Sequence, residues 1–262
     1  MSDDALALER DEGIAIITLN RPQRFNALLP ESGRTLREIL LELEADSAVR
    51  AVVLTGAGRA FCAGADISPG SATMDAEAVL REIWNPLAET MAGLELPLVA
   101  AVNGVAAGAG ASLSFACDLR VASRSARFQL SFVKIGLVPD CGATWLLPRI
   151  VGLGRANEMA MLGGDIGAEQ AREWGLVNEL VEDGEALDAA VAMARRFTAV
   201  SASASSIKLA HNAGLECGLG EQLDREAVLQ GRLQQAPDFA EATAAFAEKR
   251  PAEFAPRTPP QR

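Results

Sequence analysis

The chain lacks several residue types on which common catalytic chemistry depends. Its 262 residues contain no tyrosine, a single histidine and four cysteines that form no C-x-x-C pair. Zinc sites and disulfide frameworks need clusters of these residues, so neither is predicted and no metal site is expected. The one histidine, His211, lies beside the predicted C-terminal end of a helix, where the dipole favours a cation. A structural role for His211 is therefore expected, and a Ser-His-Asp triad is not.

Positive charge is also scarce. The sequence has 24 Lys and Arg residues against 35 Asp and Glu, a net charge of -11 and a pI near 4.7. Nucleic-acid binding depends on clustered basic residues, so no nucleic-acid partner is predicted. The first residues, MSDDALALERDEG, do not have the basic and apolar segments of a signal peptide. An uncharged stretch at 96–117 is interrupted by proline, asparagine and glycines, so we expect a cytoplasmic protein with no membrane partner.

Apolar runs and their spacing predict an α/β chain. Leucines and isoleucine recur at helical spacing between Pro30 and Asp46, and further helices are expected after the glycine-rich loop Gly56 to Gly70 and from Ala109. Runs rich in β-branched residues predict strands at 14–19, 50–55, 98–102, 119–123, 127–130 and 177–181. The order of these helices and strands does not have the regular strand–helix alternation of a doubly wound sheet.

The last part of the chain reads as a separate helical region. Residues 201–254 carry apolar side chains at roughly amphipathic spacing, with breaks near 214–220 and at Pro237. We therefore divide the chain into a core at 1–200 and a helical region at 201–262. The helical region is too small to bury its own apolar faces, so it is expected to pack on the core or on another subunit. The Pro-rich end, 255–262, is expected to be frayed.

Two loops rich in glycine and alanine each follow a predicted strand. Phe61–Ile67 reads FCAGADI, and Val102–Ser112 reads VNGVAAGAGAS and opens a helix. The second loop has no third glycine at position 113, and the sequence has no phosphate-binding P-loop, so neither NAD nor ATP is expected as a cofactor. Small residues let a ligand approach the backbone closely. The two loops are interpreted as a pair of N–H donors for a developing oxyanion.

Asp140 is an isolated carboxylate in the segment GLVPDCGATWLLPR. It precedes a predicted helix, so its side chain either caps that helix or transfers a proton. A helix N-terminus would lower its pKa, whereas burial among Val138, Trp145 and Leu146 would raise it. The sequence pattern leaves both roles open.

With these motifs in place, the chain resembles the crotonase, or enoyl-CoA hydratase/isomerase, superfamily over nearly its whole length. The resemblance rests on segments in matching order at 17–28, 51–67, 97–123, 126–128, 136–144, 172–181 and 244–250. It implies a crotonase-type spiral of ββα units, and a helical C-terminal region that forms a homotrimer or a dimer of trimers. It also implies an acyl-CoA thioester as ligand, with no cofactor beyond the coenzyme A of the substrate itself.

The resemblance also assigns roles by position. The oxyanion donors are the N–H groups of Ala65 and Ala109, the latter at a helix N-terminus where the family commonly has glycine. Other matched positions bind the substrate or its CoA portion, the C-terminal pair in some members from a neighbouring subunit: Arg24, Ala63, Asp66, Ile67, Phe132, Phe246 and Lys249.

Departures from the family's residue pattern help to distinguish among the activities known in the family. Hydratases need two glutamates, and those positions hold Ser112 and Phe132 here. Asp140 stands where hydratases usually carry glycine, as in dienoyl-CoA isomerases, aryl-CoA dehalogenases and the isomerases of phenylacetate degradation. The resemblance is strongest to the last group, which converts ring-1,2-epoxyphenylacetyl-CoA to oxepin-CoA. Phe132, Trp84 and Trp145 are either a pocket for such a ring or ordinary core.

We therefore expect an isomerase in which Asp140 removes the proton alpha to the thioester. The alternatives, in order, are a Δ3,Δ2-enoyl-CoA or dienoyl-CoA isomerase of fatty-acid oxidation, an enoyl-CoA hydratase, and a noncatalytic acyl-CoA binder.

Overall fold

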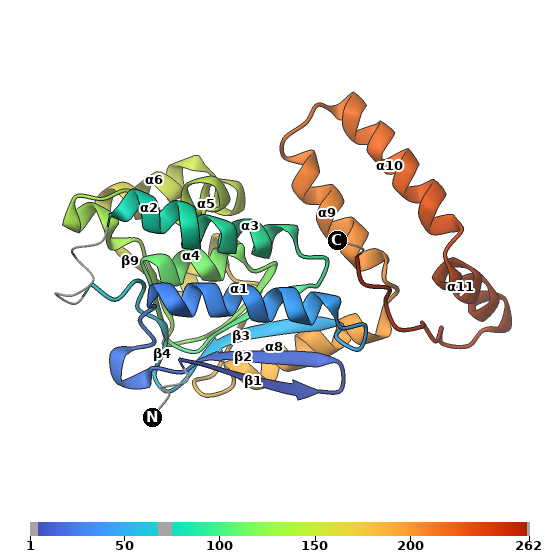
Figure 1. The fold of residues 1–262 in the computed structure, drawn as a ribbon, viewed down its shortest axis with the longest axis horizontal. Helices are drawn as coiled ribbons and strands as arrows, with labels where there is room; N and C mark the ends of the chain where they lie inside the picture. The colour runs from blue at the N-terminus through green and yellow to red at the C-terminus, as the bar shows by residue number, and fades with distance from the viewer. Residues whose placement is uncertain (1–4, 68–74, 261–262) are drawn as a thin grey trace.

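The computed structural model describes residues 5–67 and 75–260 and contains two β-sheets covered by helices (Figure 1). The larger sheet has the order β1-β2-β3-β5-β7-β10, and its strands are parallel except for β1, which pairs with β2 in antiparallel fashion. Its strands are β1 (Leu6–Asp11), β2 (Ile14–Leu19), β3 (Ala51–Gly56), β5 (Leu98–Val102), β7 (Leu119–Ser123) and β10 (Glu179–Val181).

The smaller sheet has the order β4-β6-β8-β9, with only β9 antiparallel to its neighbour. It consists of β4 (Ala60–Cys62), β6 (Val105–Ala107), β8 (Arg127–Gln129) and β9 (Asp165–Gly167). Consecutive strands such as β3 and β4, or β5 and β6, enter different sheets before a helix follows. The predicted spiral of ββα units is thus confirmed.

Tight contacts between successive turns hold the spiral together. A methyl group built on Gly104, between β5 and β6, would lie 2.2 Å from the carbonyl oxygen of Arg59, between β3 and β4. Only glycine lets these two connections lie so close. Asn103 also joins them, because its Nδ2 donates to the carbonyl oxygens of Gly56 at 2.8 Å and Gly58 at 2.9 Å.

Helices fill the connections between the strands. Figure 1 shows α1, α3 and α4 stacked on one side of the larger sheet, with α8 on the other. Helices of the body are α1 (Pro30–Ala45), α2 (Ala76–Val79), α3 (Asn85–Gly93), α4 (Ala109–Ala116), α5 (Ala143–Val151), α6 (Leu153–Leu162), α7 (Ala168–Glu173) and α8 (Ala186–Arg195). Shorter turns are η1 (Pro22–Arg24), η2 (Leu80–Trp84, a π-helix), η3 (Ser131–Ile135) and η4 (Arg196–Ala199).

The buried apolar residues form two clusters, one on each side of the larger sheet. The first lies between the sheets and helices α1, α3 and α4, and the second lies between the larger sheet and α8, where Ala190 and Ala194 are fully buried. Strand β3 is buried along its whole length, as expected for a strand covered on both faces. The predicted helix over residues 30–46 and the predicted strands correspond to α1 and to observed strands, with ends that differ by a few residues.

Three helices form a tail that projects from the body (Figure 1). They are α9 (Ser203–Gly214), α10 (Leu219–Gln234) and α11 (Pro237–Glu248), so the predicted helical region and both of its breaks are confirmed. Helix α9 is tied to the body by the Lys208 ammonium, 2.8 Å from Asp118, and by the Asn212 amide, 2.9 Å from the Ala92 carbonyl oxygen. The prediction of a frayed end at 255–262 is wrong for residues 255–260. Arg257 is only 5% exposed and contacts the end of α1.

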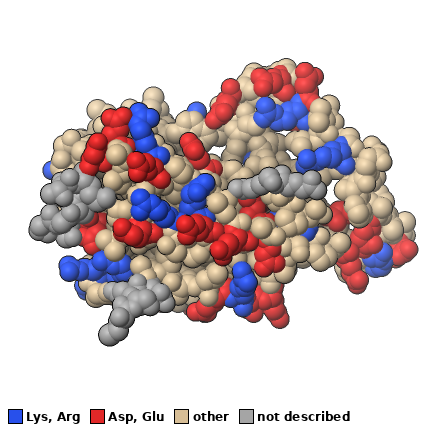
Figure 2. Space-filling view, viewed as in Figure 1, with Lys and Arg blue, Asp and Glu red and all other residues tan. Residues whose placement is uncertain are grey.

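The surface carries mixed charge. On the face that Figure 2 shows, Lys and Arg side chains alternate with Asp and Glu and form no continuous basic area. Within residues 5–67 and 75–260, no helix combines the length and apolar content needed to span a membrane. Those same residues contain no group of three or more His, Cys, Asp or Glu side chains suited to a metal ion. The last three residues of the predicted Gly56–Gly70 loop lie outside the described residues.

Candidate active site

The two Gly/Ala loops lie against each other at one edge of the smaller sheet. They follow β4 and β6, which pair in parallel, so both loops leave the same edge of the sheet. A methyl group built on Gly64 would lie 2.8 Å from the Ala107 carbonyl oxygen and 3.2 Å from the Ala109 nitrogen. The structure therefore brings the two loops together in the way that the sequence predicted.

The N–H groups of Ala65 and Ala109 are oriented away from the usual backbone partners. Leu28 forms a parallel bridge with Ala65, in which its N–H donates to the Gly64 carbonyl oxygen and its carbonyl oxygen accepts from the Asp66 N–H. In this pattern the N–H of Ala65 itself points away from Leu28. Ala109 is the first residue of α4, and the N–H of a first helical residue has no acceptor within its helix. Both groups are suited to bind a ligand oxygen.

Asp140 lies in a tight turn ahead of α5 and does not cap it. The N-cap of α5 is Gly142, and the first turn of the helix receives no side-chain cap. The Ala143 N–H donates to the Asp140 carbonyl oxygen at 3.0 Å, and both residues between them, Cys141 and Gly142, have positive φ. This is a type I′ turn, with the Asp140 side chain outside the capping position. The cap interpretation of Asp140 is wrong.

The surroundings of Asp140 suit a proton-transfer group. Its Oδ1 atom is buried and, among the described residues, has no hydrogen-bond partner. Burial raises the pKa of the Asp140 carboxyl above its ordinary value, and a hydrogen bond from Cys141 opposes part of that shift. A carboxylate with a raised pKa and an unpaired oxygen is a stronger base than one held in an ion pair.

Contacts around Cys62 link the Asp140 turn to the oxyanion loops. Helix α5 packs on α4, and Cys62, the last residue of β4, is close enough to Cys141 that its charge would raise the pKa of the Cys141 thiol. A methyl group on Gly110 would lie 2.6 Å from the Cys62 Cβ, so β4 and α4 also touch here. The Gly64 N–H donates to the Cys62 sulfur at 3.4 Å. The carboxylate and the two donors thus share one region.

The two positions at which the family's hydratases carry glutamate hold side chains without a carboxylate here. Ser112 is fully buried, and its hydroxyl donates to the Gly108 carbonyl oxygen at 3.2 Å. Phe132 is 8% exposed, and its ring lies 3.9 Å from a methyl group built on Gly108. Phe132 therefore borders the oxyanion loop. Trp84 packs against Gly33 of α1, and the Trp145 ring lies under the Arg149 guanidinium at 4.0 Å.

Among the residues matched to CoA binding, those near the first loop lie on the surface. Arg24, Ala63 and Ile67 are exposed, whereas the Asp66 carboxylate is mostly covered and lies 3.1 Å from the Arg21 guanidinium. Asp66 therefore braces its loop against the segment that follows β2.

Sequence reasoning missed Arg21 and Asn26, which support the first loop. Arg21 also donates to the Ala27 carbonyl oxygen at 2.6 Å, and the buried Asn26 amide donates to the carbonyl oxygens of Ala57 and Ala60. The N-R-P sequence after β2 was the available signal, but spacing alone does not pair Arg21 with Asp66.

Phe246 and Lys249 do not reach this region within one chain. They belong to α11 and its C-terminal cap, which Figure 1 shows at the far end of the molecule from β4 and α2. Phe246 is 87% exposed. The single chain therefore leaves these two residues apart from the other predicted site residues.

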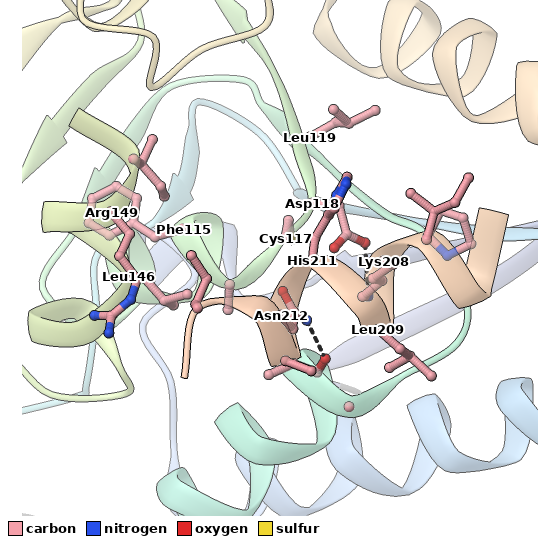
Figure 3. A pocket seen from close by; sticks show the side chains of 18 of the residues that line it. Phe115, Cys117, Asp118, Leu119, Leu146, Arg149, Lys208, Leu209, His211 and Asn212 are labelled. Atoms are coloured by element: carbon pink, nitrogen blue, oxygen red, sulfur yellow. Dashed lines mark hydrogen bonds and ion pairs between the residues drawn. The ribbon is translucent and has the colours of Figure 1, made fainter. Parts of the chain in front are cut away.

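A cavity of about 750 Å³ lies elsewhere, between the body and α9 (Figure 3). Its lining includes Phe115 and Leu146 from the body together with Lys208 and His211 from α9. His211 is in the last turn of α9, as its predicted structural role requires. None of the predicted site residues lines this cavity, which is at the C-terminal end of α4, whereas Ala109 is at its N-terminus.

Comparisons with known proteins agree with this architecture. The enoyl-CoA hydratase/isomerase family matches residues 9–257. The chain is 41% identical over 250 residues to the 1,2-epoxyphenylacetyl-CoA isomerase of Escherichia coli K12, covering 93% of this chain and 95% of that protein. It is 45% identical over 259 residues to a Rhodobacter capsulatus protein named "Probable enoyl-CoA hydratase", covering 98% and 100%.

A solved structure gives the same result. The crystal structure of an enoyl-CoA hydratase from Bacillus anthracis superposes with a TM-score of 0.91 at 32% identity, covering 97% of this chain and 100% of that one. The profile match, the curated relatives and the fold agree over nearly the whole chain. The chain belongs to the enoyl-CoA hydratase/isomerase family, the crotonase superfamily.

Proposed function

We propose that this enzyme isomerises an acyl-CoA thioester by removing the proton alpha to the thioester carbonyl. The carrying observation is the buried, unpaired carboxylate oxygen of Asp140 beside two loops whose Ala65 and Ala109 N–H groups are available. No cofactor enters the proposal, since coenzyme A arrives as part of the substrate.

The chemistry follows from these groups. An Asp140 oxygen takes the alpha proton, the electrons of the C–H bond move into the thioester, and the resulting enolate oxygen accepts hydrogen bonds from Ala65 and Ala109. The positive end of α4 supports that charge. The protonated Asp140 then returns the proton to another carbon, so the composition of the substrate does not change. This proton transfer does not require a second carboxylate.

Isomerisation is favoured over hydration by what stands at the two glutamate positions. Hydration of an enoyl-CoA needs groups that activate a water molecule and deliver its proton. The Ser112 hydroxyl is already bonded to Gly108, and Phe132 is an apolar ring. Neither side chain can act as a general base at neutral pH.

For the acyl group, we propose ring-1,2-epoxyphenylacetyl-CoA, converted to oxepin-CoA in phenylacetate degradation. With this substrate the bond between the two epoxide carbons also breaks while the oxygen stays bonded to both, so the six-membered ring expands to seven members and the composition is unchanged. Two observations support this choice: the identity to the Escherichia coli isomerase, and the apolar Phe132 ring beside the oxyanion loop. The runner-up is a Δ3,Δ2-enoyl-CoA or dienoyl-CoA isomerase. An assay that compares ring-1,2-epoxyphenylacetyl-CoA, a 3-enoyl-CoA and crotonyl-CoA as substrates distinguishes these activities. Preferential turnover of the aliphatic 3-enoyl-CoA would support the runner-up. Preferential turnover of crotonyl-CoA would support a hydratase.

We also propose that the enzyme is a homotrimer, or a dimer of trimers, in which Phe246 and Lys249 complete the CoA site of a neighbouring subunit. The tail leaves large apolar side chains exposed in the single chain, among them Val228 at 72% and Phe246 at 87%. Burial of such side chains is worth about 1.5–3 kcal/mol each, which favours covering them by association.

The decisive test of the catalytic role is Asp140→Asn. We expect solvent-deuterium exchange at the alpha carbon of phenylacetyl-CoA, followed by NMR, to slow about 10²- to 10⁴-fold, because a general base contributes that much. Asp165→Asn, which changes a carboxylate paired with Arg127 on the surface, should keep the wild-type rate. Wild-type exchange in Asp140→Asn would refute the role of Asp140, and no exchange in the wild type with any thioester tried would favour a noncatalytic acyl-CoA binder.

A further inference from the structure

A buried arginine lies at the end of α4 that is opposite the oxyanion donor Ala109. Arg120 is only 5% exposed, and its guanidinium donates to the carbonyl oxygens of Ser114 at 3.1 Å and Cys117 at 2.5 Å. The last carbonyl oxygens of a helix have no partner within it and form the negative end of its dipole. Arg120 therefore covers the negative end of α4 with a full positive charge.

Carbonyl oxygens, and not an acid, surround this charge. Among the residues that the structure describes, no carboxylate forms an ion pair with Arg120. Asp118 instead pairs with Lys208 at 2.8 Å, and its Oδ2 also accepts the Leu98 N–H. Arginine keeps its proton in proteins, and a buried charge without a counter-charge is costly. The end of α4 thus holds one positive charge in excess.

Further hydrogen bonds fix Arg120 to the larger sheet. Its Nε donates to the Leu176 carbonyl oxygen at 2.5 Å. Its backbone N–H donates to the Asn178 side-chain oxygen at 2.8 Å, and the Asn178 N–H donates to the Arg120 carbonyl oxygen at 2.9 Å. The other end of α4 contacts Cys62 of β4 through Gly110. The helix is thus held at both ends.

The charge at one end of α4 also acts on the other end. The helix has eight residues, none of them charged, and is about 12 Å long. Residues 109–115 are buried, and charges act over longer distances in such surroundings than in water. With an effective dielectric constant of about 20, a full charge at that distance changes the rate of a step that forms an anion by about 5- to 10-fold.

We propose that Arg120 is a positioning residue of the oxyanion site: it holds α4 against the sheet and offsets the negative end of the helix, so that the positive end acts on the enolate oxygen at Ala109. The inference rests on the proposed role of Ala109 as an oxyanion donor. It assigns part of the enolate stabilisation to a residue at the far end of the helix.

The test measures how strongly the bound thioester carbonyl is polarised. Phenylacetyl-CoA labelled with ¹³C at this carbonyl is bound to the whole protein, and infrared difference spectroscopy gives its stretching frequency, which a stronger oxyanion site lowers. The alpha-exchange rate at saturation and the Kd of phenylacetyl-CoA are measured alongside. Arg120→Gln removes the charge and keeps an N–H donor, whereas Arg120→Lys keeps the charge.

We expect Arg120→Gln to move the frequency toward that of free phenylacetyl-CoA. The saturated rate should fall about 5- to 10-fold and the Kd should change less than about twofold, because the enolate carries more charge than the bound thioester. Arg120→Lys should recover most of the rate. Arg257→Gln is the matched control, since Arg257 is also 5% exposed and binds the end of a helix, α1, that has no proposed oxyanion donor. It should keep the wild-type frequency and rate.

A second pair of variants leaves Arg120 intact and decides the question if Arg120→Gln does not fold. Ala116, the last residue of α4, is partly exposed and lines the cavity between the body and α9 together with Arg120. Ala116→Glu adds a negative charge at this end of the helix, and Ala116→Gln is its neutral match. We expect only Ala116→Glu to shift the frequency and the rate in the direction of Arg120→Gln.

Three outcomes overturn the inference: a wild-type frequency and rate in Arg120→Gln or Ala116→Glu, equal changes in Arg257→Gln, or an Arg120→Lys variant as impaired as Arg120→Gln. If binding to the wild-type protein does not lower the carbonyl frequency, the proposed oxyanion site itself fails. A frequency that is lowered in the wild type and unmoved in the variants refutes only the role of Arg120.

Discussion

At the scale of single residues, Asp140 combines a function with a cost in stability. Its pKa is raised in the folded protein from the ordinary value of 3.8, chiefly by burial. Because its pKa is higher in the folded than in the unfolded state, the Asp140 carboxyl favours folding most at low pH, where it is protonated in both of these states. This favourable contribution is lost as the pH rises through the folded-state pKa, because the buried charge is then unfavourable.

Asp140→Asn should therefore stabilise the protein at neutral pH while removing activity. We expect the Tm at pH 7 to rise by roughly 1–3 °C and the gain to vanish below about pH 4, measured by thermal unfolding across this range. Asp165→Asn is a control of opposite sign, since the Arg127 ion pair lowers the Asp165 pKa. A Tm gain for Asp140→Asn that is independent of pH would show that the cost of the buried charge is not the cause.

Gly64 holds the two oxyanion loops at contact distance. Its φ of +95° and the 2.8 Å separation from the Ala107 carbonyl oxygen leave no room for a methyl group. Gly64→Ala should lower the alpha-exchange rate about 10²-fold and destabilise the fold by about 1–3 kcal/mol. Gly152→Ala also places a side chain at positive φ, at +84°, but has open space around the methyl group, so it should reduce stability without the loss of rate. Equal rates in both variants would contradict the close contact.

At the scale of elements, Arg257 connects the end of the chain to α1. Its guanidinium donates to the carbonyl oxygens of Leu43 at 3.2 Å and Val49 at 3.0 Å, and also to those of Glu44 and Asp46. The last carbonyls of a helix have no partner within it, and a cation there also interacts favourably with the dipole. The strap formed by residues 251–260 thus fixes the return of the tail to the body.

Arg257→Ala should remove a hydrogen-bond donor from all four carbonyl oxygens, of which those of Leu43 and Asp46 also accept from the backbone N–H groups of Asp46 and Val49. We expect the free energy of unfolding to fall by about 1–3 kcal/mol in urea titrations, and residues 249–260 to become sensitive to limited proteolysis. Arg81→Ala removes an exposed arginine that is paired with Glu77, and should change the stability by less than about 1 kcal/mol. Unchanged stability in Arg257→Ala would show that water replaces the guanidinium.

At the scale of the whole molecule, helices α10 and α11 project from the body with apolar side chains exposed (Figure 1). Val228→Glu places a charge among them and should shift the assembly toward monomers in light scattering, with loss of activity if Phe246 and Lys249 serve a neighbour's site. Gln230→Glu adds the same charge to α10 without removing an apolar side chain, and should remain assembled. A wild-type monomer that turns over substrate would refute the assembly.

Periodicity and side-chain size were enough to predict most helices and strands and the loops that follow them. The apolar, β-branched run at 50–55 predicted a strand, the leucine spacing of 30–46 predicted an amphipathic helix, and the small residues at 63–65 and 108–111 marked loops that permit close contact. These are local properties, because periodicity and side-chain size act within a few residues. The resemblance in motifs added the order of the ββα units.

Contacts between residues far apart in the chain could not be predicted from the sequence. Nothing in the spacing of Arg21 and Asp66, or of Arg257 and the end of α1, indicates that they are neighbours. Whether Asp140 capped its helix depended on one turn, in which Cys141 and Gly142 both take positive φ. Such outcomes follow from packing across many residues of sequence separation, where burial and the available partners set both the orientation of a side chain and its pKa.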